Sequence, residues 1–433
     1  MSSVSSIEVH KFGGASIKDA AGFRNVAQVI KGIQQGAERG NLLIIVSALG
    51  KTTNALEKLT TAFYTRQVEQ TRELMTQIRK QHTDLLNELF HTKDHAVYDD
   101  VSNCFTEIEW VIEDDPHDSY DFVYDQIVSV GELLSSRMLS AWLNESAVEN
   151  EWADARDYLI ADNTYREGLV DMDRSCGNIR NVLLPLVRQS VVVCQGFIGG
   201  TTENYTITLG REGSDYSAAI FAHCLDAVSL TVWKDVPGIM NADPAEFPEA
   251  VVLPQLSYAE TTELAYYGAT VIHPKTLKPL QSKAIPLFVK SFKNLTAPGT
   301  LVSEIAGLPE FPSYIFKREQ LVLTLQTPDF SFILENHLSH IFQIFAHNRI
   351  KINMMENSAL SFTAVIDGNR NEANFSRLLD DLSLTFSVKY NTGLTLLTVR
   401  NYLKDPQTAY KFILDQEVIL ESKTRHNIQF VYR

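Results

Sequence analysis

Residues 7–14 read Ile-Glu-Val-His-Lys-Phe-Gly-Gly, a stretch in which apolar and polar side chains alternate until two glycines end it. An alternation with a period of two predicts a β-strand. Residues 23–33 follow with helical spacing, and residues 42–46 form an uninterrupted apolar run. Such a run is typical of a strand buried on both faces, so this segment predicts a strand–helix–strand unit of a parallel sheet.

Further buried strands are predicted at residues 191–194 and 230–233, and residues 55–115 are rich in helical patterns. Strands that alternate with helices place the chain in the α/β class, with a mainly parallel sheet. A capping box at residues 257–260 predicts a helix that ends at Gly268.

The large domain is expected to end soon after a last strand at residues 286–289. Turn residues then predict a linker: Pro298, Gly299, Gly307, Pro309 and Pro312. We therefore assign residues 1–305 to the large domain and residues 306–319 to the linker.

The tail has a different pattern of elements. Residues 320–391 predict the order βαββαβ, which is that of a ferredoxin-like α+β unit. The last strand of this unit is predicted at residues 384–390. The order begins again at residues 392–433, with a strand at residues 394–399, and predicts a weak internal duplication. This second unit is short, and residues 306–319 are candidates to complete it.

Composition excludes several classes of protein. The 433 residues carry a formal net charge of −15, which argues against a general nucleic-acid binder because phosphate backbones need a basic surface. No apolar run is long enough to cross a membrane, and residues 1–6 lack the pattern of a signal peptide. Four widely spaced cysteines, Cys104, Cys176, Cys194 and Cys224, predict reduced thiols rather than disulfides or a zinc site. We therefore expect a cytoplasmic protein.

Polar and glycine-rich clusters follow the predicted strands, at residues 11–16, 46–54, 195–200 and 234–238, with another at 210–215. Ligands of open parallel sheets bind beyond the carboxyl ends of the strands, so we expect these clusters to meet at one edge. Each also has a simpler interpretation: a turn, a solvated lysine, or a helix cap. Gly50-Lys51-Thr52 is not a P-loop, because Ile45 stands where that motif requires glycine.

The residue types suit a nucleoside triphosphate and an amino acid. Glycines let the backbone approach phosphate oxygens, and Lys11 can neutralise charge on a transferring phosphoryl group. Arg211 offers a bidentate fork for a carboxylate. Glu132 can hold an ammonium, although it can also simply occupy a first helical turn that favours acids.

Together and in this order, the clusters resemble those of the aspartate kinases of the amino-acid kinase superfamily, and the resemblance extends over nearly the whole chain. It implies an αβα sandwich followed by two ferredoxin-like ACT units. It also implies transfer of the γ-phosphoryl group of ATP to the side-chain carboxylate of L-aspartate. The matching segments are residues 11–16, 46–54, 131–133, 195–199, 208–216, 235–239 and 268–274.

The resemblance assigns roles to individual residues. Lys11 falls on the lysine that stabilises the transition state, and Asp215 on the aspartate that orients it. Ser47, Thr53, Glu132, Arg211 and Ser214 fall on substrate-binding positions. The positions on the nucleotide side are Lys11, Gly13, Gly14, Lys234, Asp235, Met240, Thr270 and Lys275.

Several positions depart from the family pattern. Glu212 stands where glycine is common, Met240 where tyrosine is frequent, Ala245 where a basic residue is frequent, and Thr270 where lysine is frequent. The sequence contains no cluster of metal ligands, so Mg²⁺ is expected to be held mainly by the phosphates.

The tail predicts regulation and assembly. Asn336-His337 and Asn353 replace a Gly-Phe pair and an acidic residue of lysine-inhibited members. Without that charge we expect weak lysine inhibition or another amino-acid effector. ACT units pair between subunits, which implies a homodimer or higher homo-oligomer. The chain ends soon after the last predicted strand, so no homoserine dehydrogenase module is expected.

Two other functions stay open at this point. One is an amino-acid kinase that acts on glutamate or N-acetylglutamate. The other is a ligand-sensing protein that uses the kinase fold only as a scaffold. The paired tail units, Glu132 and Arg211 favour the aspartate kinase.

Overall fold

The computed structural model describes residues 7–36, 41–269, 271–304, 310–329, 331–368 and 372–433, which form two compact units. The first comprises residues up to 239, 252–262 and 271–308, and the second comprises residues 240–251, 263–270 and 309–433. The predicted domain boundaries therefore stay predictions, because two short segments of the large domain group with the tail.

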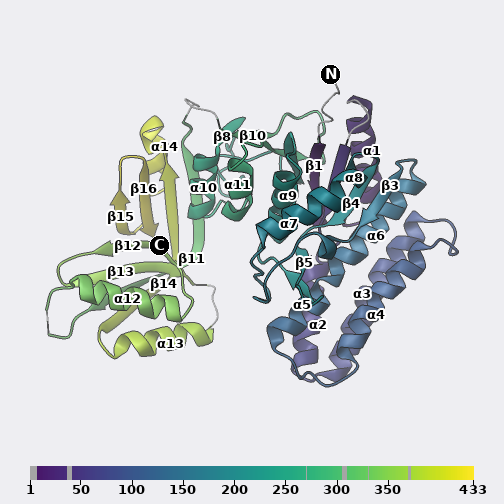
Figure 1. Ribbon diagram of the computed structural model, residues 1–433. Coiled ribbons are helices and arrows are strands. Elements are labelled where there is room, and N and C mark those ends of the chain that lie inside the picture. The colour runs from purple at the N-terminus through teal and green to yellow at the C-terminus, as the bar shows by residue number, and fades with distance from the viewer. Residues whose placement is uncertain (1–6, 37–40, 270, 305–309, 330, 369–371) are drawn as a thin grey trace. The chain divides into compact units, whose positions relative to one another are not determined.

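The first unit is built on an eight-stranded sheet in the order β3-β4-β2-β1-β7-β9-β10-β8, mainly parallel (Figure 1). Its strands are β1 (Ile7–Phe12), β2 (Asn41–Val46), β3 (Asn150–Ala153), β4 (Val191–Gln195), β7 (Ser229–Lys234), β8 (Gln255–Ser257), β9 (Leu287–Ser291) and β10 (Thr300–Ser303). All six residues of β2 are buried, so both faces of the sheet are covered, as its apolar run predicts.

Helices cover the sheet in two layers. The helices of this unit are α1 (Ala20–Gly36), α2 (Thr52–Tyr64), α3 (Val68–Leu89), α4 (Val97–Ile112), α5 (Tyr120–Val128), α6 (Val130–Glu145), α7 (Met172–Asn178), α8 (Leu184–Val187), α9 (Gly213–Cys224), α10 (Tyr258–Tyr267) and α11 (Pro274–Gln281). The last turns of α10 belong to the second unit. Helices α6 and α1 pack together, while α9 packs on β1, β2 and β7 with α7 and α11 beside it. Helices α2–α5 form a bundle next to α6 (Figure 1).

A small antiparallel hairpin completes the unit. Strands β5 (Ile198–Gly200) and β6 (Thr206–Thr208) follow β4 and lead directly into α9. The segment therefore joins the end of a central strand to the N-terminus of a helix that packs on the sheet.

The second unit has a six-stranded antiparallel sheet in the order β12-β13-β11-β14-β16-β15. Its elements are β11 (Ser313–Gln326), α12 (Glu335–His347), β12 (Ile352–Asn357), β13 (Ser361–Asp367), α13 (Glu372–Ser383), β14 (Ser387–Arg400), α14 (Pro406–Lys411), β15 (Val418–Lys423) and β16 (Asn427–Tyr432). Helices α12 and α13 cover one face, where Leu323, Phe362 and Leu378 pack in a buried core. The first half of β11 pairs with the second half of β14.

These elements confirm the fold class: a helix-covered, mainly parallel sheet followed by α+β units in the order βαββαβ and a shorter second set. The predicted helix is confirmed as well, because α10 begins at Tyr258, where the Glu260 N–H donates to Ser257 Oγ, and ends before Gly268, whose φ is +121°.

Two expectations were wrong. Residues 286–289 are not part of the last strand of the large domain, because β10 adds to the same sheet directly after Pro298-Gly299. Residues 384–390 and 394–399 do not form two strands, because β14 runs unbroken from Ser387 to Arg400. At Gly393, whose φ is +69°, the pairing with β11 shifts register between Asn391 and Leu394, so the glycine marks an irregularity inside one strand.

Candidate active site

Two lysines hold one buried aspartate at the carboxyl edge of the parallel sheet. Lys11 Nζ lies 2.7 Å from Asp215 Oδ1, and Lys234 Nζ lies 3.1 Å from Asp215 Oδ2. Strand β1 carries Lys11 near its end, the adjacent strand β7 ends with Lys234, and the first turn of α9 carries Asp215. The three groups together have a net charge of +1, which suits an anionic ligand.

The two ammonium groups decide the charge of Asp215. Burial by itself would raise the pKa of this carboxyl, but Lys11 and Lys234 lower it below its ordinary value of 3.8. The start of α9 adds the partial positive charge of a helix N-terminus. Asp215 is therefore ionised at neutral pH and keeps both lysines in place.

The glycine pair after β1 brings the backbone close to this cluster. A Cβ on Gly13 would lie 3.5 Å from Lys11 Nζ, so this turn passes directly by the ammonium group. A Cβ on Gly14 would lie 2.5 Å from the Ala48 carbonyl oxygen, and the Gly50 N–H donates to the Gly14 carbonyl at 3.1 Å. Glycine is required at position 14 because two loops of the sheet edge meet there.

Glu132 is a buried carboxylate with spare acceptor capacity. It lies in the first turn of α6, is 2% exposed, and accepts the Ala48 N–H through Oε1 at 3.1 Å. Its Oε2 has no hydrogen-bond partner among the described residues. Burial raises its pKa to about 8, despite the Ala48 N–H and the charge of Lys11. A buried carboxylate of this kind needs a cation or a proton as its partner. This favours the interpretation of Glu132 as a cation-binding group over that of an acid that only stabilises the start of the helix.

The Gly196 loop packs against the start of α9. A Cβ on Gly196 would lie 2.6 Å from the Ser214 Cβ, and Ser217 Oγ accepts the Phe197 N–H at 3.1 Å. Glu212, the departure from glycine, has φ of +54° at the cap of this helix, so the chain keeps the left-handed backbone there with a side chain present.

The other predicted residues lie at different places. Ser47 follows β2 and Thr53 lies in the first turn of α2, both half-buried. Arg211, Asp235 and Lys275 are exposed. Met240 belongs to the second unit, and Thr270 lies outside the described residues. The structure thus brings together Lys11, Gly13, Gly14, Glu132, Asp215 and Lys234 with the loop that carries Ser47 and the first turn of α9, which carries Ser214.

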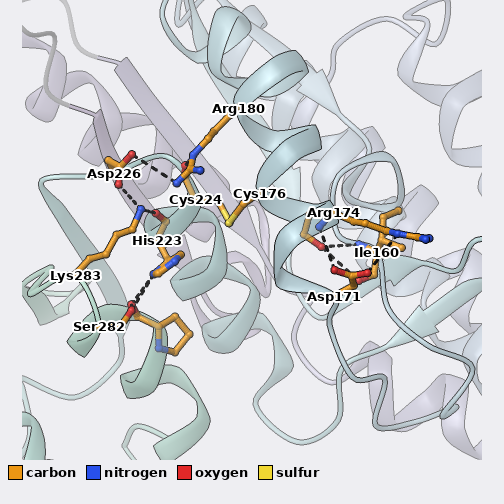
Figure 2. Close-up of a disulfide and its surroundings, with 12 residues drawn as sticks. Ile160, Asp171, Arg174, Cys176, Arg180, His223, Cys224, Asp226, Ser282 and Lys283 are labelled. Carbon is orange, nitrogen blue, oxygen red and sulfur yellow. Dashed lines mark hydrogen bonds and ion pairs between the residues drawn. A yellow bond between two sulfur atoms is a disulfide. The ribbon is translucent and has the colours of Figure 1, made fainter.

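The expectation of four reduced cysteines was wrong. Cys176 of α7 and Cys224, the last residue of α9, form a disulfide, whereas Cys104 and Cys194 are free and buried (Figure 2). The two bonded cysteines are 48 residues apart, so no local spacing predicts the bond. Packing of α7 against α9 brings them together.

Sequence reasoning also missed Asp125, a fully buried aspartate of α5. The sequence around it reads as an ordinary helix with acids on its surface, and only its contacts reveal that the carboxylate points inward.

Comparison with known proteins shows the family. The family model described as amino acid kinase family matches residues 6–291, about two thirds of the chain. The chain belongs to the amino acid kinase family. Among solved structures, this family member is similar to Escherichia coli aspartokinase III in complex with aspartate and ADP (TM-score 0.82, 27% identity, covering 98% of this chain and 96% of the other). The structure of that enzyme with lysine and aspartate gives a TM-score of 0.81 at 28% identity, covering 98% and 95% of the two chains.

Two curated relatives agree with this result. Lysine-sensitive aspartokinase 3 of E. coli (strain K12) is 29% identical over 402 residues, 92% of this chain and 87% of that protein. Bifunctional aspartokinase/homoserine dehydrogenase 2 of Arabidopsis thaliana is 36% identical over 302 residues, 68% of this chain but 32% of the relative. This chain therefore spans about a third of the length of the bifunctional relative. The resemblance to aspartate kinases is confirmed.

Proposed function

We propose that this protein is an aspartate kinase, which transfers the γ-phosphoryl group of ATP to the β-carboxylate of L-aspartate and gives 4-phospho-L-aspartate, the first step of lysine, threonine and methionine biosynthesis. The observation that carries the proposal is the ion cluster of Lys11, Asp215 and Lys234 beside the Gly13-Gly14 turn. The similarity to aspartokinase III with aspartate and ADP bound supports it.

At the phosphate end, the chain supplies charge and backbone amides. Lys11 and Lys234 stabilise the negative charge that spreads over the transferred group as its bond to ADP breaks and a bond to the carboxylate oxygen forms. Asp215 keeps both ammonium groups aimed at this point. Gly13 and Gly14 let the backbone approach the phosphate oxygens, and Asp235 and Lys275 with Met240 and Thr270 are proposed for the nucleotide side.

At the amino-acid end, Glu132 binds the ammonium of aspartate. Its unpaired Oε2 is satisfied when that cation arrives, and the carboxylate then ionises. Arg211 binds a carboxylate of the substrate through its planar fork. Ser47, Thr53 and Ser214 are proposed as hydroxyl donors around it.

Mg²⁺ fits this site only with the phosphates as its main ligands. No group of three or more His, Cys, Asp or Glu side chains suited to a metal occurs among the residues that the structure describes, and Asp215 is held by two lysines. When bound, Mg²⁺ would neutralise phosphate charge that the two lysines do not reach.

Trapping of the acyl phosphate tests the proposal. The purified protein is incubated with Mg-ATP, hydroxylamine and one amino acid at a time. A hydroxamate with aspartate alone supports the aspartate kinase, and one with glutamate or N-acetylglutamate alone supports another amino acid kinase. No hydroxamate with any of them supports a sensing protein without turnover.

For regulation, we propose an amino-acid effector in the tail and weak inhibition by lysine. The Asn353 side chain already accepts from Lys317 Nζ at 2.8 Å and donates to Gln320 and Asp367. A neutral side chain with its own lysine partner has little to offer the ammonium of free lysine. Half-inhibition at low micromolar lysine would contradict this proposal.

We also propose a homodimer or higher homo-oligomer. Edge strand β12 exposes Met355 (55%), and the α12 side chain Phe342 is 41% exposed, so apolar surface lies near an unpaired strand edge. Light scattering coupled to size exclusion measures the mass, and a monomer at micromolar concentration would overturn the proposal.

The location of the protein is proposed to be the cytoplasm. Within the described ranges, every helix is too short or too polar to cross a membrane. Fractionation of the source cells tests this proposal, and recovery of the protein outside the cytoplasmic fraction would contradict it.

A further inference from the structure

Asp125 is a carboxylate that the proposed reaction does not use, yet it is completely buried. It lies in α5 and accepts three hydrogen bonds: from Thr208 Oγ1 at 2.6 Å, from the Thr208 N–H at 3.0 Å and from the Arg166 N–H at 3.0 Å. These three donor groups belong to Thr208 of β6 and to Arg166, both distant in sequence from α5. Burial of an ionised carboxylate is unfavourable unless the carboxylate accepts hydrogen bonds, and these three donors supply them.

The contact suits a carboxylate. Two backbone N–H groups donate to Asp125 Oδ2 and one hydroxyl donates to Oδ1, and a carboxylate accepts all three with no donor of its own. Asparagine could keep the two N–H contacts and turn its NH₂ group toward Thr208 Oγ1, a hydroxyl that can also accept, so removal of the contact takes a side chain without acceptors.

A second α5 side chain holds the other end of the same strand. Gln126 Nε2 donates to the Thr206 carbonyl at 2.9 Å, and its Oε1 accepts the Thr206 N–H at 3.3 Å. Asp125 and Gln126 thus hold both ends of β6, the three-residue strand Thr206–Thr208.

Strand β6 leads into the substrate-binding segment. Thr208 is three residues before Arg211 and six before Ser214 in the chain. Between them, Gly210 has φ of +77°, and its carbonyl accepts the Gly213 N–H at 2.9 Å, so the turn is compact. Because the turn is short, the position of Thr208 restricts the position of Arg211.

The same part of the chain carries Glu132. Helix α5 ends at Val128 and α6 begins at Val130, with Ser129 between them. One continuous pair of helices therefore presents Glu132 directly and holds the Arg211 segment through Asp125.

We infer that Asp125 is a positioning residue, which fixes the Arg211 segment relative to Glu132 and so sets the spacing between the groups that bind the two charged ends of aspartate. This inference rests on the proposed function. Asp125 acts through Thr208 and touches neither substrate nor nucleotide.

Steady-state kinetics of Asp125→Ala test the inference. Loss of both acceptor oxygens is expected to raise KM for aspartate about tenfold or more, since hydrogen bonds to buried charged groups are worth more than those between neutral groups. KM for ATP is expected to stay within about twofold, because the groups at Lys11 and Gly13 are untouched. A merely structural role would change both constants, or only the amount of folded protein.

Milder variants keep the test informative if Asp125→Ala does not fold. Thr208→Val removes only the hydroxyl donor and is expected to raise KM for aspartate, whereas Thr208→Ser keeps it and is expected to restore the wild-type value. Asp118→Asn, at an exposed aspartate just before the same helix that pairs with its neighbour His117, is the control and is expected to leave both constants unchanged.

The outcomes are distinguishable. Normal KM for aspartate in folded Asp125→Ala or Thr208→Val, with an active wild type, overturns the positioning role and leaves the kinase proposal standing. A wild type that forms no acyl phosphate overturns both.

Discussion

Lys11 Nζ and Asp215 Oδ1 are 2.7 Å apart, and both side chains are almost completely buried. An ammonium group in this position would be costly to bury without its partner, and the carboxylate keeps it charged at the sheet edge. Asp215 also contacts Lys234. It therefore holds the ammonium groups of two adjacent strands close to one point.

Replacement of Lys11 by alanine is expected to lower kcat by about 100-fold or more, as for other groups that stabilise charge in a transition state. Stability is expected to fall as well, because Lys11 is buried and Asp215 loses one of its two cations. Hydroxamate formation measures kcat. Lys18→Ala, at an exposed lysine in the segment after β1, serves as the control. Near-normal kcat in Lys11→Ala would mean that the site is elsewhere.

Glu132→Gln is expected to change both the pH dependence of stability and the binding of aspartate. The folded-state pKa of about 8 lies above the ordinary 4.5, so the stability contributed by the protonated form is fully present below about 4.5 and is lost as pH rises through about 8. The variant lacks this loss, so its melting temperature is expected to fall less than that of the wild type between about pH 6 and pH 9.

The same variant is expected to bind aspartate poorly, because a neutral amide cannot pair with the ammonium. Glu145→Gln, at an exposed glutamate of the same helix, is the control for both measurements. Equal pH dependence of melting in Glu132→Gln and wild type would show that Glu132 does not titrate in this range.

Gly14→Ala and Gly32→Ala form a matched pair. The new methyl at position 14 would lie 2.5 Å from the Ala48 carbonyl oxygen, whereas nothing lies within 4 Å at position 32 in α1. We expect a loss of about 1–3 kcal/mol in unfolding free energy and reduced kcat for Gly14→Ala. Gly32→Ala is expected to gain up to about 1 kcal/mol because alanine favours the helix. Urea unfolding measures both, and equal stability of the two variants would contradict the close approach at Gly14.

The Cys176–Cys224 disulfide closes a loop over a separation of 48 residues, which predicts about 4 kcal/mol of stabilisation by restriction of the unfolded chain. Oxidised wild type is expected to melt at a lower temperature after addition of reductant. Cys176→Ser is expected to show no such shift. Titration of four thiols in the unfolded, unreduced protein would contradict the bond.

Much of the first unit followed from the sequence alone. Strand β1, the buried strand β2 and the glycine pair could be predicted because period, apolar runs and turn residues are local properties. The edge at which Lys11, Lys234 and Asp215 meet could be predicted because parallel strands all end there.

Contacts between distant segments could be found only in the tertiary structure. In the sequence, Asp125 looks like any helical acid, and only the structure shows that Thr208 and Arg166 donate hydrogen bonds to it. No sequence motif links Cys176 to Cys224, which are brought together by the packing of α7 against α9. Strand β14 runs through Gly393, where φ is +69° and the pairing with β11 shifts register between Asn391 and Leu394, because pairing on both sides of this irregularity keeps the strand continuous. The strands and the places where charge gathers can be predicted from the sequence, because they are properties of neighbouring residues. Which buried polar groups and thiols face each other is known only from the fold, because burial and pairing depend on the whole packed chain.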